Sequence, residues 1–97
     1  MAMNEIDKIK KQILPIVKRN KIRRAGIFGS FATGSFTNTS DVDILVELGN
    51  NISLLDFVRI KLDLEDSLQR KVDLVEYKAI KPRLRKQILE EEIRIYG

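Results

Sequence analysis

Apolar residues recur every three or four positions in three parts of the chain, and this spacing places them on one face of a helix. Ser53, with Asp56 three residues later, resembles a capping box that marks the start of the second helix. Pro82 fits the first turn of the third helix. Pro15 lies inside the first pattern, where it predicts a kink or the start of a second short helix. The predicted helices span residues 4–20, 53–69 and 82–91.

Three shorter runs are apolar, or alternate between apolar and polar residues, as short strands do. The tail IRIY, from Ile93 onward, either extends the last helix or pairs at a sheet edge. Helices alternating with three strands indicate an α/β or α+β fold, with a small mixed β-sheet and helices packed on one face. The predicted strands span residues 22–28, 41–48 and 72–76, with a helical turn over 30–34 and a polar loop over 35–40.

The second predicted helix carries a broad apolar stripe. We expect this stripe to be mainly core, and any part of it that is wider than the core needs to be a partner surface. The stripe consists of Leu54, Phe57, Val58, Leu62, Leu64 and Leu68.

The absence of two residue types removes whole classes of chemistry. The 97 residues include no cysteine and no histidine, which excludes disulfide frameworks, thiol nucleophiles and catalytic triads built on an imidazole base. Any chemistry must then rest on carboxylates, hydroxyls, Lys, Arg, Tyr and backbone groups. The length suits one domain, over residues 1–97. Because no apolar run approaches about 18 residues and no signal-peptide core is present, we expect a cytoplasmic protein without a membrane span.

Positive charge is concentrated at the start of the chain. The net charge is +4, whereas residues 1–24 alone hold eight Lys and Arg against two acidic residues. Such a basic arm favours a nucleotide, a nucleic acid or an acidic partner, and the simpler alternative is a solvated helix face. Aromatic residues make up only 6% of the chain and do not interleave with the basic ones, which argues against a nucleic-acid partner.

The strand over residues 41–48 begins with two aspartates separated by one residue. On a strand, Asp41 and Asp43 share one face, opposite Val42 and Ile44. Two carboxylates this close repel each other, and a hard cation such as Mg²⁺ removes that penalty while accepting substrate phosphates. Taken alone, the pair also fits a solvated strand end with acidic decoration.

Gly29 and Ser30 follow the first predicted strand, where the chain turns into the short helical segment. A glycine lets the backbone approach a phosphate closely, and the N–H groups at the start of a helix bind anions. Ser30 adds a hydroxyl donor or caps the turn. Taken alone, the pair also fits a plain strand-to-helix turn, and the segment matches neither the P-loop nor the dinucleotide-binding fingerprint.

The two features together form one composite pattern, GSFATGSFTNTSDVDILVEL, over residues 29–48. This pattern resembles the nucleotidyltransferase signature of the polymerase-beta-like superfamily, in which a third acidic residue lies on a later strand. Asp73, in KVDLVEY, meets that expectation. The resemblance covers nearly the whole chain, and its length and order are similar to the minimal nucleotidyltransferases of prokaryotes, the MntA-type antitoxins paired with HEPN-domain toxins.

The resemblance implies a role for each matching residue. Gly29 and Ser30 hold the triphosphate of ATP, Asp41 and Asp43 bind two Mg²⁺ ions, and Asp73 joins one metal and helps to deprotonate the acceptor hydroxyl. The implied reaction transfers AMP to a hydroxyl group, typically of a tyrosine, on the cognate HEPN toxin. The AMP groups then block the ribonuclease site of the toxin. The partner is therefore expected in a hetero-complex, since a chain of this size has no second domain to present an acceptor.

One position departs from the pattern of many relatives, which carry Arg where this chain has Thr33. Threonine cannot supply a positive charge near the phosphates, although Lys71 or Arg83 could compensate. The departure keeps open a second function, in which the chain is a binding module that neutralises the toxin by stoichiometric contact. The intact Asp41, Asp43 and Asp73 favour the enzyme.

Overall fold

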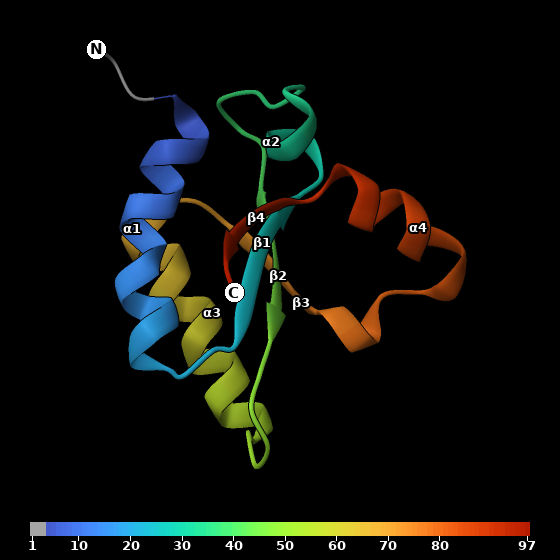
Figure 1. Cartoon of the computed structure of the whole chain (residues 1–97). Coiled ribbons are helices and arrows are strands. Elements are labelled where there is room, and N and C mark those ends of the chain that lie inside the picture. Colours follow the sequence, from blue (N-terminus) through green and yellow to red (C-terminus); the bar gives the residue numbers. More distant parts are fainter. Residues whose placement is uncertain (1–3) are drawn as a thin grey trace.

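The computed structural model describes residues 4–97, which form four strands, four α-helices and one 3₁₀ turn in these residues (Figure 1). The elements are α1 (Glu5–Arg19), β1 (Arg24–Phe28), α2 (Ser30–Thr33), β2 (Val42–Glu47), α3 (Leu54–Leu68), β3 (Val72–Glu76), η1 (Tyr77–Ala79), α4 (Pro82–Glu91) and β4 (Ile93–Tyr96). The capping box at Ser53 and Asp56 is present at the start of α3. No helix among these residues has the length and apolar character needed to cross a membrane.

The four strands form one mixed sheet in the order β3-β2-β1-β4. β1 pairs antiparallel with both β2 and β4, whereas β2 and β3 are parallel. A parallel pair needs a crossover connection, and α3 supplies it. The predicted mixed sheet is therefore confirmed, with β3 and β4 at its two edges.

The tail of the chain forms the fourth strand. β4 pairs with β1, so that Ile93 lies opposite Ile27 and Arg94 opposite Gly26. Ile95 is buried in the main core, which anchors the strand. Of the two outcomes left open for the tail, edge pairing is the one observed.

The main core lies between the sheet and the pair α1 and α3, which cover one face as expected (Figure 1). Its fully buried side chains include Ile13, Ile27, Ile44 and Leu64. The opposite face carries a second, smaller cluster beneath η1 and α4, formed by Leu45, Tyr77 and Ile80. The sequence did not indicate this cluster, because on that face β2 offers a single apolar residue between two acidic ones.

Pro15 does not divide the first helix. α1 runs from Glu5 to Arg19 as one helix, so of the two outcomes expected at Pro15, the start of a second short helix is not observed. Proline removes one backbone hydrogen bond, and the buried side chains Ile9, Ile13 and Val17 hold the turns on both sides against the sheet.

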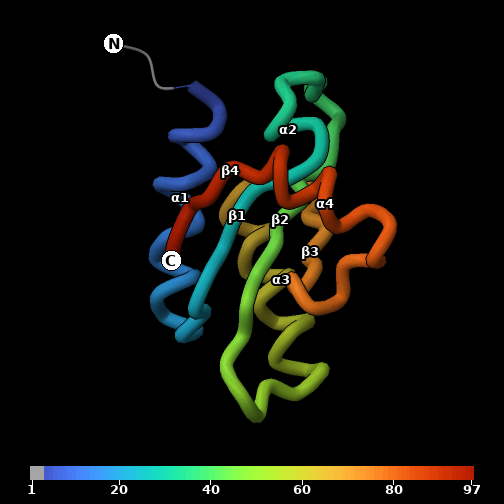
Figure 2. The backbone as a smooth tube through the Cα atoms, turned by 45° about the vertical axis from the view of Figure 1, so that its right-hand side comes forward, coloured from blue at the N-terminus to red at the C-terminus, as the bar shows by residue number. Residues whose placement is uncertain are grey.

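Only part of the apolar stripe of α3 enters the core. Ile60 and Leu64 are buried, whereas the predicted core residues Leu54, Val58 and Leu62 are exposed. Val58 and Leu62 lie on the side of α3 away from Ile60 and Leu64. Leu54 lies in the first turn, beyond the end of the antiparallel α1, whose last residue, Arg19, pairs with Asp63 at 3.6 Å. Figure 2 shows the first turns of α3 reaching beyond the end of α1.

Candidate active site

Two of the three predicted aspartates are direct neighbours across the sheet. Asp43 of β2 and Asp73 of β3 are partners in the register of the parallel pair, and neighbouring strands lie about 4.8 Å apart. The residues flanking each of them, such as Ile44 and Leu74, point into the main core. Both aspartates therefore project from the opposite face of the sheet, and Asp73 is exposed.

Asp41 lies just before β2 and adds a third negative charge to this part of the molecule. Burial, together with the charges of Asp73 and then Asp41, raises the pKa of Asp43 from 3.8 to about 6. Like charges within a few ångströms disfavour each other's ionised form. The three aspartates thus repel one another when no cation is bound to them.

This donor set suits a divalent cation. Among residues 4–97, no three acidic, histidine or cysteine side chains gather closely enough to make a complete metal site by themselves. Asp43 and Asp73 are neighbours in register, and Asp41 is close enough for its charge to act on Asp43. Carboxylate oxygens are the ligands that Mg²⁺ prefers, and a cation would offset the repulsion around Asp43. The chemistry of the residues present therefore fits the metal that the family resemblance implies.

The glycine–serine turn lies against the aspartates. Phe28, the residue before Gly29, is the register partner of Asp43 on the antiparallel strand β2. Gly29 has a φ of 71°, and a Cβ at this position would overlap the carboxylate of Asp43. Glycine is therefore required here both by the backbone conformation and by the close approach of the acid.

The turn presents backbone donors beside the carboxylates. The N–H groups of Ala32 and Thr33 both donate to the carbonyl of Gly29. The N–H groups of Ser30 and Phe31 come first in the helix and therefore have no acceptor within it. α2 has only four residues, so its dipole is small and the N–H groups themselves carry the attraction for an anion. The hydroxyl of Thr33 lies 3.0 Å from that of Ser35 and 3.3 Å from the Gly29 carbonyl, which ties the turn together.

An open groove of about 890 Å³ contains all three aspartates. The basic side chains that line it with them are Lys61, Arg70 and Lys71. Of the two basic residues that could compensate for Thr33, Lys71 lines this groove and Arg83 does not.

Arg70 is a site residue that the sequence reasoning missed. Its Nη1 donates to the carbonyl oxygens of Asn38 at 3.2 Å and Ser40 at 3.1 Å, in the loop that leads to Asp41. Its guanidinium also lies over the ring of Phe31, 5.2 Å from the ring centre. The one available signal was its position three residues before Asp73, which alone does not reveal contacts with residues more than 30 positions away.

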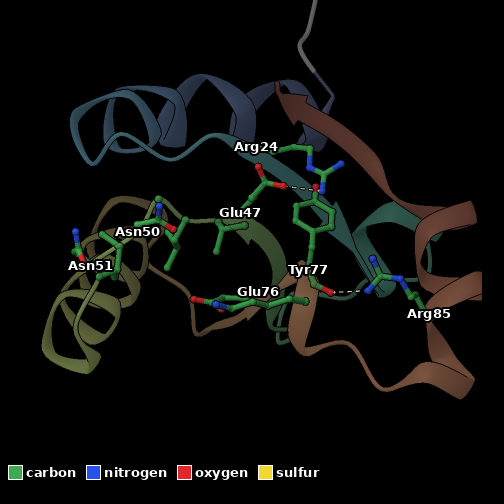
Figure 3. A pocket seen from close by; sticks show the side chains of 12 residues that line it. Arg24, Glu47, Asn50, Asn51, Glu76, Tyr77 and Arg85 are labelled. Carbon is green, nitrogen blue, oxygen red and sulfur yellow. Dashed lines mark hydrogen bonds and ion pairs between the residues drawn. The ribbon is translucent and has the colours of Figure 1, made fainter.

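A second hollow, of about 410 Å³, lies at the far end of the strands (Figure 3). Its charged groups are largely satisfied by one another: Arg24 pairs with Glu47 at 3.0 Å and stacks over the Tyr77 ring, 4.2 Å from the ring centre. Arg85 donates to the Tyr77 carbonyl at 2.8 Å. This hollow contains none of the predicted site residues.

The chain is similar to proteins named as adenylyltransferases. It is 47% identical to the putative protein adenylyltransferase MJ0435 of Methanocaldococcus jannaschii, over 91% of this chain and 95% of that protein. It is 35% identical to the protein adenylyltransferase MntA of Thermococcus cleftensis, over 96% of this chain and 95% of that protein.

Two solved structures share the fold. One is described as a putative minimal nucleotidyltransferase and is 36% identical, with a TM-score of 0.80 over 96% of this chain and 95% of that one. The other is a chain of a toxin–antitoxin complex solved with AMP-PNP, with a TM-score of 0.79 over 91% of this chain and 73% of that one; at 23% identity it shows the fold alone.

The match to the family described as "Polymerase beta, Nucleotidyltransferase" spans residues 11–97, and so includes the glycine–serine turn and all three aspartates. The mixed sheet is therefore that of a nucleotidyltransferase fold. The chain belongs to the polymerase beta nucleotidyltransferase family.

Proposed function

We propose that this chain transfers AMP from ATP to a hydroxyl group, in particular that of a tyrosine, on a cognate HEPN toxin, and thereby acts as an antitoxin. The observation that carries the proposal is the contact between the Gly29 turn and Asp43, which in turn faces Asp73. This contact puts donors for a triphosphate directly beside carboxylates for a divalent cation.

The relatives support the protein acceptor. Two of them, at 47% and 35% identity, are named protein adenylyltransferases, and a structure with the same fold is a toxin–antitoxin complex with AMP-PNP, an analogue of ATP. With ATP as donor, we place the reaction in the cytoplasm.

The proposed reaction is an in-line displacement at the α-phosphorus of ATP. The acceptor oxygen forms a bond to that phosphorus, the bond to the β-phosphate oxygen breaks, and pyrophosphate leaves. The N–H groups of Ser30 and Phe31, with the Ser30 hydroxyl, bind the phosphates and orient them for attack. Asp73 accepts the proton of the attacking hydroxyl, for which its exposed position suits it.

Asp41, Asp43 and Asp73 are the residues that would hold two Mg²⁺ ions. When bound, such ions neutralise phosphate charge and lower the pKa of a nearby hydroxyl. The chain's own contribution is to hold Asp43 and Asp73 side by side on one face of the sheet, through the register of β2 with β3, with Asp41 directly before β2.

The test is transfer of label. The chain is mixed with α-labelled ATP, Mg²⁺ and the product of the adjacent reading frame, and the partner is examined for label. We expect label on the partner with the unsubstituted chain, and none with Asp41→Asn/Asp43→Asn. Label that persists in the double variant, or no label with either version, contradicts the proposal.

One observation favours a second candidate function, that of a binding module. Thr33 makes only hydrogen bonds within its own turn and adds no positive charge. In that case both the unsubstituted chain and the Asp41→Asn/Asp43→Asn variant neutralise the partner equally, without label.

A further inference from the structure

The first three turns of α3 carry an exposed apolar stripe. The exposed fractions are 78% for Leu54, 76% for Leu55, 40% for Val58 and 56% for Leu62. Leu55, Val58 and Leu62 follow the three- and four-residue spacing of one helix face. Soluble proteins seldom expose several large apolar side chains side by side unless something binds there.

No other element can cover this stripe within the described chain. α1, the neighbour of α3, ends at Arg19 beside Asp63, as the 3.6 Å ion pair between them shows. Before Asp63, α3 projects past the end of α1 (Figures 1 and 2). The exposure of the stripe therefore follows from how the helices are arranged, and not from the conformation of one side chain.

The stripe is continuous with the groove that contains the aspartates. Leu62, at one end of the stripe, lines that groove together with Asp43 and Asp73. Leu55 lies seven residues before it, about 10 Å away along the helix. A protein that reaches the aspartates with one side chain thus also lies over α3.

A second feature widens the apolar surface. Leu54 borders a groove of about 430 Å³ between the start of α3 and β3, lined also by Phe57, Leu74 and Val75. β3 is an edge strand of the sheet. Apolar side chains thus line both sides of the projecting part of α3.

We infer that this stripe, formed by Leu54, Leu55, Val58 and Leu62, is the docking surface for the acceptor protein. The inference rests on the proposed function, which requires a partner that brings a hydroxyl group to the aspartates. Docking on the stripe orients the partner so that this hydroxyl enters the groove beside Leu62.

Charge distinguishes this partner from a second copy of the chain. α3 carries four acidic residues and two basic ones, although the whole chain has a net charge of +4. A complementary partner therefore presents an apolar patch with a basic rim. A second copy docked through the same helix would instead bring the same negative excess to the contact.

The test measures binding rather than transfer, so that it is independent of the chemistry. The probe is the purified product of the adjacent reading frame, and its affinity for each version of the chain is measured by titration calorimetry. We expect Leu55→Gln/Leu62→Gln to weaken binding at least tenfold, because a few apolar anchors carry most of the binding free energy. Glutamine keeps the helix propensity of leucine, so the fold is retained.

Two controls accompany the double variant. Leu84→Gln, at an exposed leucine of α4, should bind the partner as the unsubstituted chain does. Asp41→Asn/Asp43→Asn should bind it equally well, since docking does not need the carboxylates. Thermal unfolding of Leu55→Gln/Leu62→Gln should match that of the unsubstituted chain.

Several results would overturn the inference. Equal affinity of the double variant and the unsubstituted chain is one. Another is sedimentation of the chain alone as a dimer that Leu55→Gln/Leu62→Gln converts to monomer, which would make a second copy the occupant. Stripe-dependent binding without label transfer supports the docking surface while contradicting the proposed reaction, and absence of binding by every version contradicts both.

Discussion

The guanidinium of Arg70 donates a hydrogen bond of 3.1 Å to the carbonyl oxygen of Ser40, the residue directly before Asp41. The same nitrogen also donates to the carbonyl of Asn38 at 3.2 Å. Arg70 itself lies three residues before Asp73. One side chain thus connects the loop that leads to the first aspartates with the strand that carries the third.

This connection predicts that Arg70 positions the site. Arg70→Ala should lower the kcat of AMP transfer by about ten- to a hundredfold, because a small displacement of catalytic groups is costly, while KM for ATP changes little. Arg70→Lys keeps the charge but lacks the planar guanidinium that stacks over the Phe31 ring, and should recover only part of the rate. Arg83→Ala, at an exposed residue of α4, is the control. An equal loss of rate in Arg83→Ala, or full activity in Arg70→Ala, would contradict the role.

Removing the charge of Asp43 should have opposite effects on stability and activity. The pKa of Asp43 is raised to about 6 from 3.8, so the folded state binds more protons than the unfolded state between these values. The free energy of unfolding therefore falls as pH rises through this window. In EDTA at pH 7, Asp43→Asn should be about 1 kcal/mol more stable, a value already discounted for the exposure of the site, and transfer should be lost.

Thermal unfolding in EDTA at several pH values checks this prediction. The difference between Asp43→Asn and the unsubstituted chain should grow from pH 4 to pH 6 and then level off. Asp63→Asn, which breaks the ion pair with Arg19, should bring no such gain. A stability advantage that is constant from pH 4 to pH 7 would show that the charge of Asp43 is not its cause.

The contact between Gly29 and Asp43 predicts a large effect of a single added carbon. In Gly29→Ala, the Cβ overlaps the Asp43 carboxylate and the residue keeps a left-handed φ of 71°, so both stability and ATP affinity should fall. Gly34→Ala is a matched control, because its φ is 82° but a Cβ there has open space. It should lose about 1 kcal/mol of stability to backbone strain alone. ATP titration separates the two variants, because only Gly29→Ala should bind ATP more weakly. ATP affinity retained in Gly29→Ala would refute the close approach of Gly29 to Asp43.

Tyr77 is predicted to stabilise the fold without taking part in transfer. Its buried hydroxyl donates to the carboxylate of Glu92, and this contact together with burial raises the pKa of Tyr77. Tyr77→Phe should cost about 1–2 kcal/mol, because a buried carboxylate loses a donor, and should leave kcat unchanged. Urea unfolding measures the loss, with Tyr96→Phe as control. A drop in kcat at unchanged stability would instead place Tyr77 in the chemistry.

The sequence by itself determined the features that depend on near neighbours. Alternation along residues 41–48 was enough to place Asp43 on the face opposite Val42 and Ile44, because side-chain direction on a strand follows from position alone. Likewise, the capping box at Ser53 and the glycine at the strand-to-helix turn follow from local backbone geometry. The resemblance to the family added Asp73, whose match with Asp43 the sheet register then displayed.

Only the tertiary structure decided which surfaces meet. Leu54 and Leu64 belong to the same periodic stripe, yet one is exposed and the other buried, because α1 ends partway along α3. The tail could pair with β1 only because the sheet has a free edge there. The carbonyl groups that accept from Arg70 lie 30 and 32 residues earlier in the chain. The spacing of residues in a sequence indicates which side of a helix or strand each residue occupies. Whether another element packs against that side depends on where the other elements of the fold begin and end.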